Sequence, residues 1–109
     1  MASPSAEGAA GAAVVHEGER VRIDGRLDFE TARDTLGRVS AAIEGAPSAL
    51  VVDLVGVTRA NSAGLALMIE WLGVARRAGR EVRFANVPEG LRQLARVCQV
   101  DRMLDAATV

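Results

Sequence analysis

The sequence predicts an α/β domain in which helices pack against a small mixed sheet. A Val-rich apolar run at residues 50–57 is typical of a strand buried on both faces. A polar turn and a long stretch of good helix formers follow it, at residues 65–78. Alternating and helix-periodic segments occur on both sides of this unit, and together they predict the order β-β-α-β-α-β-α-(β).

The N-terminal part predicts a tail and then a hairpin. Residues 1–12 are mostly Ala, Gly, Ser and Pro, so we expect a disordered tail there and one domain at 13–109. An apolar run at 13–16 predicts a first strand and residues 17–19 a turn. Residues 20–25 predict a second strand, because Val21 and Ile23 alternate with charged side chains.

A helix is expected next, with Asp28 as its N-cap and residues 45–47, Gly-Ala-Pro, as its end. Apolar residues recur every three or four positions along it and predict one buried stripe. They are Phe29, Ala32, Leu36, Val39 and Ile43.

The C-terminal part predicts a further strand and helix. Gly79 is expected to end the central helix, and residues 81–86 alternate as a strand does. Pro88 suits the first turn of the next helix, and residues 100–104 predict a short strand or turn that closes the core. The inner stripe of that helix is Leu91, Leu94, Ala95 and Cys98.

Composition limits the possible functions. The 109 residues suit one domain, and the net charge of -1 argues against bulk nucleic-acid binding. The single cysteine allows no internal disulfide, which fits a reducing compartment. No run reaches the roughly 18 apolar residues of a membrane span, and the N-terminus lacks the pattern of a secretory signal. A soluble cytoplasmic protein is the default expectation.

Ser62 lies where the central strand ends and the central helix begins. Asn61 and Ser62 are both suitable N-caps, so one interpretation is that Ser62 only caps the helix. The other is that an exposed hydroxyl at a helix N-terminus carries a phosphate or contacts the polar groups of a partner.

Catalysis is not favoured by the sequence. His16, the only histidine, falls in the predicted first strand and is not tied to Ser62 by any sequence feature. Asp53, inside the central strand, is expected to be a buried acid satisfied by backbone donors. A Gly-x-Ser-x-Gly elbow, a P-loop, a dinucleotide fingerprint and clustered metal ligands are all absent. We therefore expect no enzyme, no cofactor and no metal site.

The central helix has more apolar surface than one buried stripe requires. Leu67, Trp71 and Val74 widen its apolar arc past half of the circumference. Either neighbouring helices cover this surface, or Trp71 and its neighbours meet another protein, for which Trp is well suited.

The sequence also resembles the STAS domain family. Its signature is similar to Val51-Val-Asp-Leu-Val-Gly-Val-Thr followed by Asn61-Ser-Ala-Gly-Leu-Ala-Leu-Met. The resemblance is strongest to the MlaB-like subunits of phospholipid-transport ABC complexes and extends to the anti-sigma factor antagonists. It implies a mixed four- to five-stranded sheet with helices mainly on one face.

The resemblance also implies a function without catalysis. MlaB-like subunits bind the ATPase subunit of the transporter, so the protein would be cytoplasmic and peripheral to the inner membrane through that partner, without inserting into it. In the sigma regulators, the residue matching Ser62 is the phosphoacceptor. The acid that usually precedes this hydroxyl is Asn61 here, which weakens the phosphorylation hypothesis. A serine hydrolase or small-molecule binder is the third hypothesis. For the leading hypothesis, the residues expected to contact the ATPase subunit are Arg59, Asn61, Ser62, Ala63, Leu65, Leu67 and Trp71.

Overall fold

The computed structural model describes residues 6–7 and 11–109. In chain order, its strands and helices are β1 (Ala6–Glu7), β2 (Ala12–Glu17), β3 (Arg20–Leu27), α1 (Ala32–Gly45), β4 (Ala49–Ala60), α2 (Ser62–Ala78), β5 (Glu81–Ala85), α3 (Glu89–Val97) and α4 (Asp101–Ala106).

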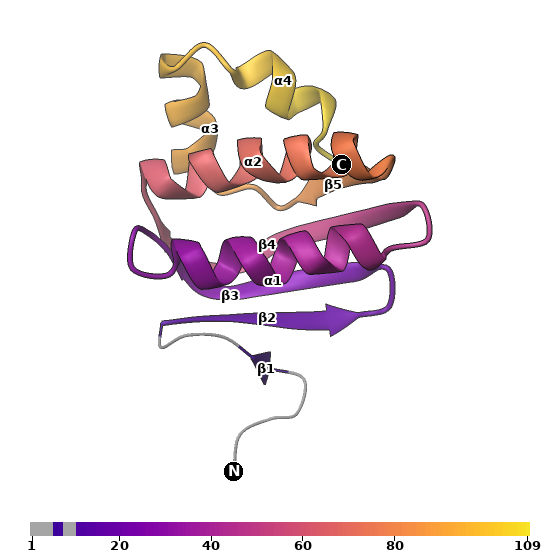
Figure 1. Cartoon of the computed structure of the whole chain (residues 1–109). Coiled ribbons are helices and arrows are strands. Elements are labelled where there is room, and N and C mark those ends of the chain that lie inside the picture. Colours follow the sequence, from indigo (N-terminus) through magenta and orange to yellow (C-terminus); the bar gives the residue numbers. More distant parts are fainter. Residues whose placement is uncertain (1–5, 8–10) are drawn as a thin grey trace.

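The strands form one mixed sheet in the order β1-β2-β3-β4-β5. β1 and β2, and β2 and β3, pair antiparallel, whereas β3, β4 and β5 run parallel. The connections through α1 and α2 both step across the sheet in the same direction. Because crossover connections between parallel strands are right-handed, α1 and α2 both lie on the same face of the sheet. They pack side by side there (Figure 1). The expected sheet with helices mainly on one face is thereby confirmed.

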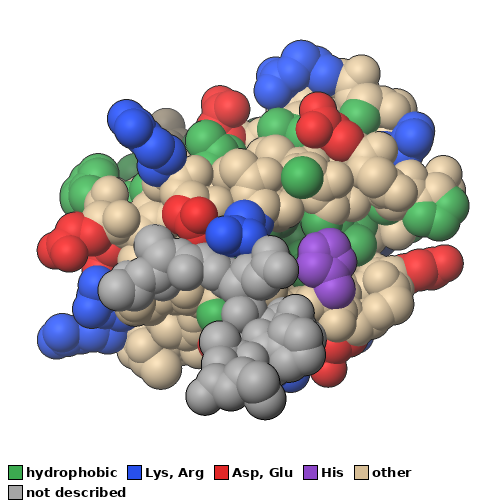
Figure 2. Space-filling model, turned by 60° about the horizontal axis from the view of Figure 1, so that its bottom comes forward, with side chains coloured by type: hydrophobic (Ala, Val, Ile, Leu, Met, Phe, Trp, Pro, Cys, Tyr) green, Lys and Arg blue, Asp and Glu red, His purple; other side chains and the backbone are tan. Residues whose placement is uncertain are grey.

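The hydrophobic core lies between this face of the sheet and the helices. Alternate residues of β3 and β4 point into it, as the period of a strand requires, and Val21, Ile23 and Val52 are fully buried. The helices contribute Val39, Met68 and other aliphatic side chains. The opposite face of the sheet carries ion pairs, Arg20 with Asp53 and Arg22 with Asp24. Figure 2, which brings the β1–β2 side forward, shows acidic and basic side chains interspersed on that side rather than gathered by sign.

Most of the predicted elements are present. The β2–β3 hairpin turns at Gly18, which has a φ of 69°. α1 ends at Gly45, and α2 ends before Gly79, whose left-handed backbone (φ 67°) forms the C-cap. Both helix ends therefore follow the local signals in the sequence.

The C-terminal segment differs from the prediction. Residues 101–106 form the helix α4 rather than the short strand or turn expected at residues 100–104, and after α4 Thr108 forms a β-bridge with Phe84 of β5. Cys98, expected in the inner stripe of α3, is exposed because α3 ends at Val97. In a short apolar run, periodicity alone does not distinguish a strand from a buried helical turn.

The predicted tail at 1–12 lies largely outside the described residues, since positions 1–5 and 8–10 are not described. Within it, Ala6–Glu7 pair with Val14 and Val15 as β1. β2 begins at Ala12, one residue before the predicted start of the domain.

Candidate functional site

Two loops meet where β3 and β4 end. Leu27 pairs with Ala60, and the Asn61 amide donates to the Leu27 carbonyl over 3.2 Å. The carboxyl ends of parallel strands lie at the same edge of a sheet, where open α/β sheets bind their ligands. The β3–α1 loop and the start of α2 accordingly lie at one end of the molecule, at the left of Figure 1.

Asn61, not Ser62, caps α2. The Asn61 side-chain oxygen accepts a hydrogen bond of 2.9 Å from the Ala63 amide, and its backbone is extended, as an N-cap requires. Ser62 is the first residue of the helix and is exposed. Within residues 6–7 and 11–109 its hydroxyl has no hydrogen-bond partner. The interpretation that Ser62 only caps the helix is therefore wrong, and the hydroxyl is accessible to another molecule.

The β3–α1 loop is held rigid by its own side chains. Asp28 Oδ1 accepts from the amides of Glu30 (3.0 Å) and Thr31 (3.1 Å). The buried Thr31 hydroxyl donates to the Arg26 carbonyl over 2.8 Å. Burial would raise the pKa of Asp28, but the Thr31 amide and the Arg26 guanidinium outweigh it and lower that pKa. Asp28 therefore stays ionised and fixes the loop.

This loop corrects two predictions and adds a residue to the site. Thr31, not Asp28, stands at the N-cap position of α1. α1 begins at Ala32, so Phe29 lies before the helix and is 74% exposed instead of lying in the buried stripe. The sequence signal for this loop is Asp28 followed by Thr31 three residues later. Side chains of this kind can hydrogen-bond to the nearby backbone and stabilise a turn, so that the helix begins later. A large exposed aromatic side chain on the loop at the same end of the molecule as Ser62 is suited to contact with a partner.

Arg59 is exposed at the end of β4, and its cross-strand neighbour is Arg26. Arg26 is neutralised by Asp28, at 2.9 Å. Arg59 has no carboxylate partner in the part of the chain that the structure describes. We call Phe29, Arg59, Asn61 and Ser62 the Ser62 edge, and it combines an aromatic ring, an unpaired cation and an unpaired hydroxyl.

Four predicted contact residues are instead buried. α1 packs along α2, and the Trp71 indole, with no exposed surface, donates to the Leu36 carbonyl of α1 over 3.4 Å. Neighbouring helices therefore cover the broad apolar arc of α2, and the expectation of a partner contact there is wrong. The buried residues are Ala63, Leu65, Leu67 and Trp71.

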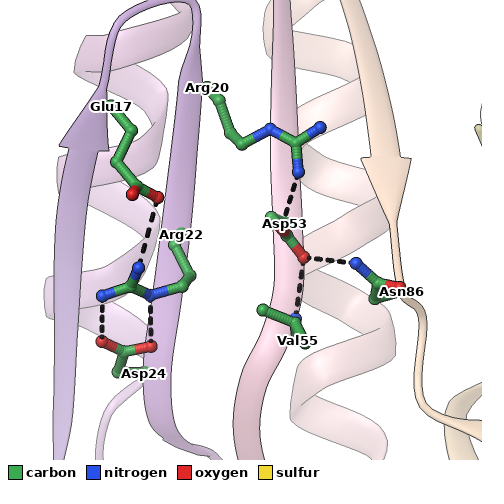
Figure 3. Close-up of polar contacts among 7 residues, drawn as sticks. All are labelled: Glu17, Arg20, Arg22, Asp24, Asp53, Val55 and Asn86. Carbon is green, nitrogen blue, oxygen red and sulfur yellow. Dashed lines mark hydrogen bonds and ion pairs between the residues drawn. The ribbon is translucent and has the colours of Figure 1, made fainter.

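Asp53 ties the three parallel strands together on the polar face of the sheet (Figure 3). The residue is 6% exposed, and its carboxylate accepts from Arg20 Nη1 at 2.7 Å, Asn86 Nδ2 at 2.9 Å and the Val55 amide at 2.9 Å. The sequence predicted backbone donors alone, whereas two of the three are side chains. Burial would raise the pKa of Asp53, but these hydrogen bonds and the Arg20 charge outweigh it and lower that pKa.

Asp53→Asn should therefore reduce stability at neutral pH more than at low pH. A carboxylate whose folded pKa is depressed contributes stability above its unfolded pKa, about 3.9, and loses it as the pH falls through the folded value. The difference in urea midpoint between wild type and Asp53→Asn should shrink as the pH is lowered from 7 to 3. Glu44→Gln, an exposed acid on α1, is the control and should show no such change. An Asp53→Asn difference that is constant over this range would contradict the assignment.

His16 does not serve Ser62 as a base. It pairs with Val21, six strand residues before Leu27, which is about 20 Å along the sheet at 3.3 Å per residue. Among residues 6–7 and 11–109, no three or more His, Cys, Asp or Glu side chains are grouped as metal ligands. In the same ranges, no helix has the length and hydropathy to span a membrane.

Comparison with known proteins agrees with the resemblance. The family model described as "Mlab, STAS domain" matches residues 12–105. The structure of the anti-sigma factor antagonist SpoIIAA in its unphosphorylated form is similar, with a TM-score of 0.65 at 16% sequence identity over 90% of this chain and 85% of that one. At this identity the likeness shows the fold alone. Curated protein sequences give no significant match.

Proposed function

Because this chain belongs to the MlaB-type STAS domain family, we propose that it is a non-catalytic subunit that binds the ATPase of a phospholipid-transport ABC transporter. STAS domains are protein-interaction modules, and the fold here is that of an anti-sigma factor antagonist. The observation that carries the proposal is the exposed Ser62 hydroxyl, which has no partner among the described residues. Through this partner, the protein would lie on the cytoplasmic side of the inner membrane without inserting into it.

The Ser62 edge offers three kinds of contact. The Phe29 ring fits an apolar pocket of the partner, and Arg59 fits an acidic side chain. The Ser62 hydroxyl both donates and accepts hydrogen bonds. Because Asn61 and Asp28 hold both loops rigid, little conformational entropy is lost on docking. Binding that favours one conformation of the ATPase would shift it toward the assembled, active state.

Ser62→Arg should lower the amount of this protein that co-purifies with the ATPase subunit at least tenfold. The long charged side chain would occupy the space into which the partner must come, while its exposed position leaves folding intact. The measurement is affinity capture of the tagged ATPase, followed by quantification of the bound subunit.

Ser48→Arg is the matched control, since it places the same side chain at an exposed serine beside the start of β4, the other end of that strand. It should co-purify as the wild type does. Phe29→Ala should also weaken capture, by about tenfold, whereas Val97→Ala, another exposed apolar residue, should not. Undiminished capture of Ser62→Arg would count against the Ser62 edge as the contact.

A second function is favoured by the same exposed hydroxyl: an anti-sigma factor antagonist regulated by phosphorylation of Ser62. A phosphate would add about -1.5 to -2 charges at a helix N-terminus, close in sequence to the unpaired Arg59. Mass spectrometry after incubation with a cognate kinase distinguishes the two functions. Absence of phosphate on Ser62 under all conditions would remove this one.

A further inference from the structure

A pocket of about 590 Å³ lies at the opposite end of α2 from Ser62. It is open to solvent and is lined by the last turns of α2, by β5 and by α4. Ser62 and Arg77 are about 22 Å apart along the helix, at 1.5 Å per residue. The volume falls within the roughly 300–1,000 Å³ that ligand sites occupy. We call this the α2–α4 pocket, and it is separate from the Ser62 edge.

Hydrogen bonds fix the wall that α4 forms. The Phe84 amide of β5 donates to the Ala107 carbonyl over 2.8 Å, and the Val109 amide donates to the Phe84 carbonyl over 2.8 Å. The Thr108 hydroxyl donates to the Leu104 carbonyl over 2.7 Å. These bonds tie the chain after α4 to β5, so the pocket is preformed.

The pocket has an apolar floor. Val82 is buried there, Ile69 and Leu72 are half-buried, and Met103 of α4 is 42% exposed. Side chains of this kind stabilise a ligand by removing its apolar surface from water.

The rim of the pocket is positively charged. It carries Arg76, Arg77 and Arg83, but a single acid, Glu81. Glu81 is engaged by Arg83, whose Nε lies 3.3 Å from its carboxylate. Arg76 and Arg77 have no carboxylate partner in the described ranges. Arg76 and Arg77 lie in the last turn of α2, where positive charges interact favourably with the helix dipole. This interaction explains why arginines occur there, but it does not explain the apolar floor beside them.

One of these guanidinium groups lies against Gly73. A Cβ at position 73 would be 3.2 Å from Arg77 Nη1 and 3.9 Å from its Cζ. The Arg77 guanidinium therefore lies across the bare backbone of Gly73, along the pocket wall. Glycine in a helix interior costs about 1 kcal/mol relative to alanine. Here it leaves room for the cation and for a ligand beneath it.

We propose that the α2–α4 pocket binds a small single-chain amphiphilic anion, an alkyl carboxylate or an alkyl phosphate. The guanidinium groups of Arg76 and Arg77 hold the anionic group by charge-assisted hydrogen bonds. The floor formed by Ile69, Leu72 and Met103 takes the alkyl chain. This site goes beyond the proposed docking function and does not depend on it.

The test is a titration of the ¹⁵N-labelled protein with sodium decanoate below its micelle concentration, followed by NMR. Decyl phosphate is the second alkyl anion to be titrated. Two compounds serve as controls: inorganic phosphate, which is an anion without an alkyl chain, and decyltrimethylammonium, which has the same chain on a cationic group. We expect saturable shifts of the amide signals of Gly73, Arg77 and Met103 with one or both alkyl anions. A comparison of decanoate with decyl phosphate then shows whether the site prefers a carboxylate or a phosphate group. Binding of the cation should be at least tenfold weaker, and phosphate alone should not saturate.

The double variant Arg76→Gln, Arg77→Gln should weaken binding of the alkyl anion at least tenfold. Gly73→Leu should weaken it similarly by filling the pocket, and because leucine is the better helix former the loss would not come from unfolding. Arg33→Gln, on α1 and away from the pocket, is the control for the loss of an exposed arginine. Lack of saturation with both alkyl anions, equal binding of the cation, or unchanged affinity in both variants would overturn the proposal. Ser62→Arg should leave this binding intact, so failure here is distinct from failure of the docking function.

Discussion

Trp71→Ala should destabilise the fold by about 3–5 kcal/mol, the range for truncating a large buried aromatic side chain. Trp71 has no exposed surface, and its indole donates to the Leu36 carbonyl of α1. The variant would leave a cavity between α1 and α2 and remove the indole hydrogen bond. A domain of this size is stable by about 5–15 kcal/mol in total, so the loss is a large fraction. Urea denaturation followed by circular dichroism is the measurement, because Trp71 is the only tryptophan.

Trp71→Phe is the matched control for this cavity. It keeps a ring in the core and loses part of the volume and the indole hydrogen bond, so its loss of stability should be clearly smaller. If Trp71 met a partner instead, Trp71→Ala would weaken binding and leave the free energy of unfolding nearly unchanged. A loss under about 1 kcal/mol would therefore contradict the α1–α2 packing described here.

Gly56→Ala should cost roughly 3 kcal/mol, at the upper end of the range for overpacking. The pairing of β3 with β4 shifts register here, and Asp24 lies opposite Gly56. A Cβ at position 56 would come within 1.9 Å of Asp24 Oδ1 and 2.8 Å of the Ile23 carbonyl oxygen. Relief requires the β3 backbone to move and the Asp24 carboxylate to leave Arg22, whose Nε it accepts from at 2.8 Å (Figure 3).

Gly37→Ala is the control, because a Cβ there meets nothing within 4 Å and position 37 lies inside α1. The same chemical change should stabilise that helix by up to about 1 kcal/mol, so the two variants should differ in sign. Combining Gly56→Ala with Asp24→Ala should recover part of the loss if the carboxylate is the main obstacle. Equal and small effects at both glycines would show that β3 and β4 accommodate a side chain at position 56.

The order of the elements from β2 to α3 could be predicted because its signals are local. Alternation in β3, the stripe that ends at Ile43, and Gly79 after α2 each act within a few residues of the chain. The position of Ser62 at the start of α2 could be predicted for the same reason. The choice of Asn61 as the cap was not, because both residues are chemically suited to it, and only the backbone conformation separates them.

The buried residues that were expected at the partner contact depend on contacts far apart in the sequence, whereas the exposure of Phe29 follows from the local turn at Asp28 and Thr31. Trp71 is buried because α1, more than thirty residues earlier, packs over it, and a helix wheel does not show which neighbour covers an apolar arc. The α2–α4 pocket exists only because the chain after α4 returns to pair with β5. By itself, the sequence determined the elements from β2 to α3, their order and the loop that presents Ser62, since hydrogen bonding and side-chain periodicity within a segment decide these. The tertiary structure alone decided which apolar side chains of the helices stay exposed, because burial depends on what packs against them.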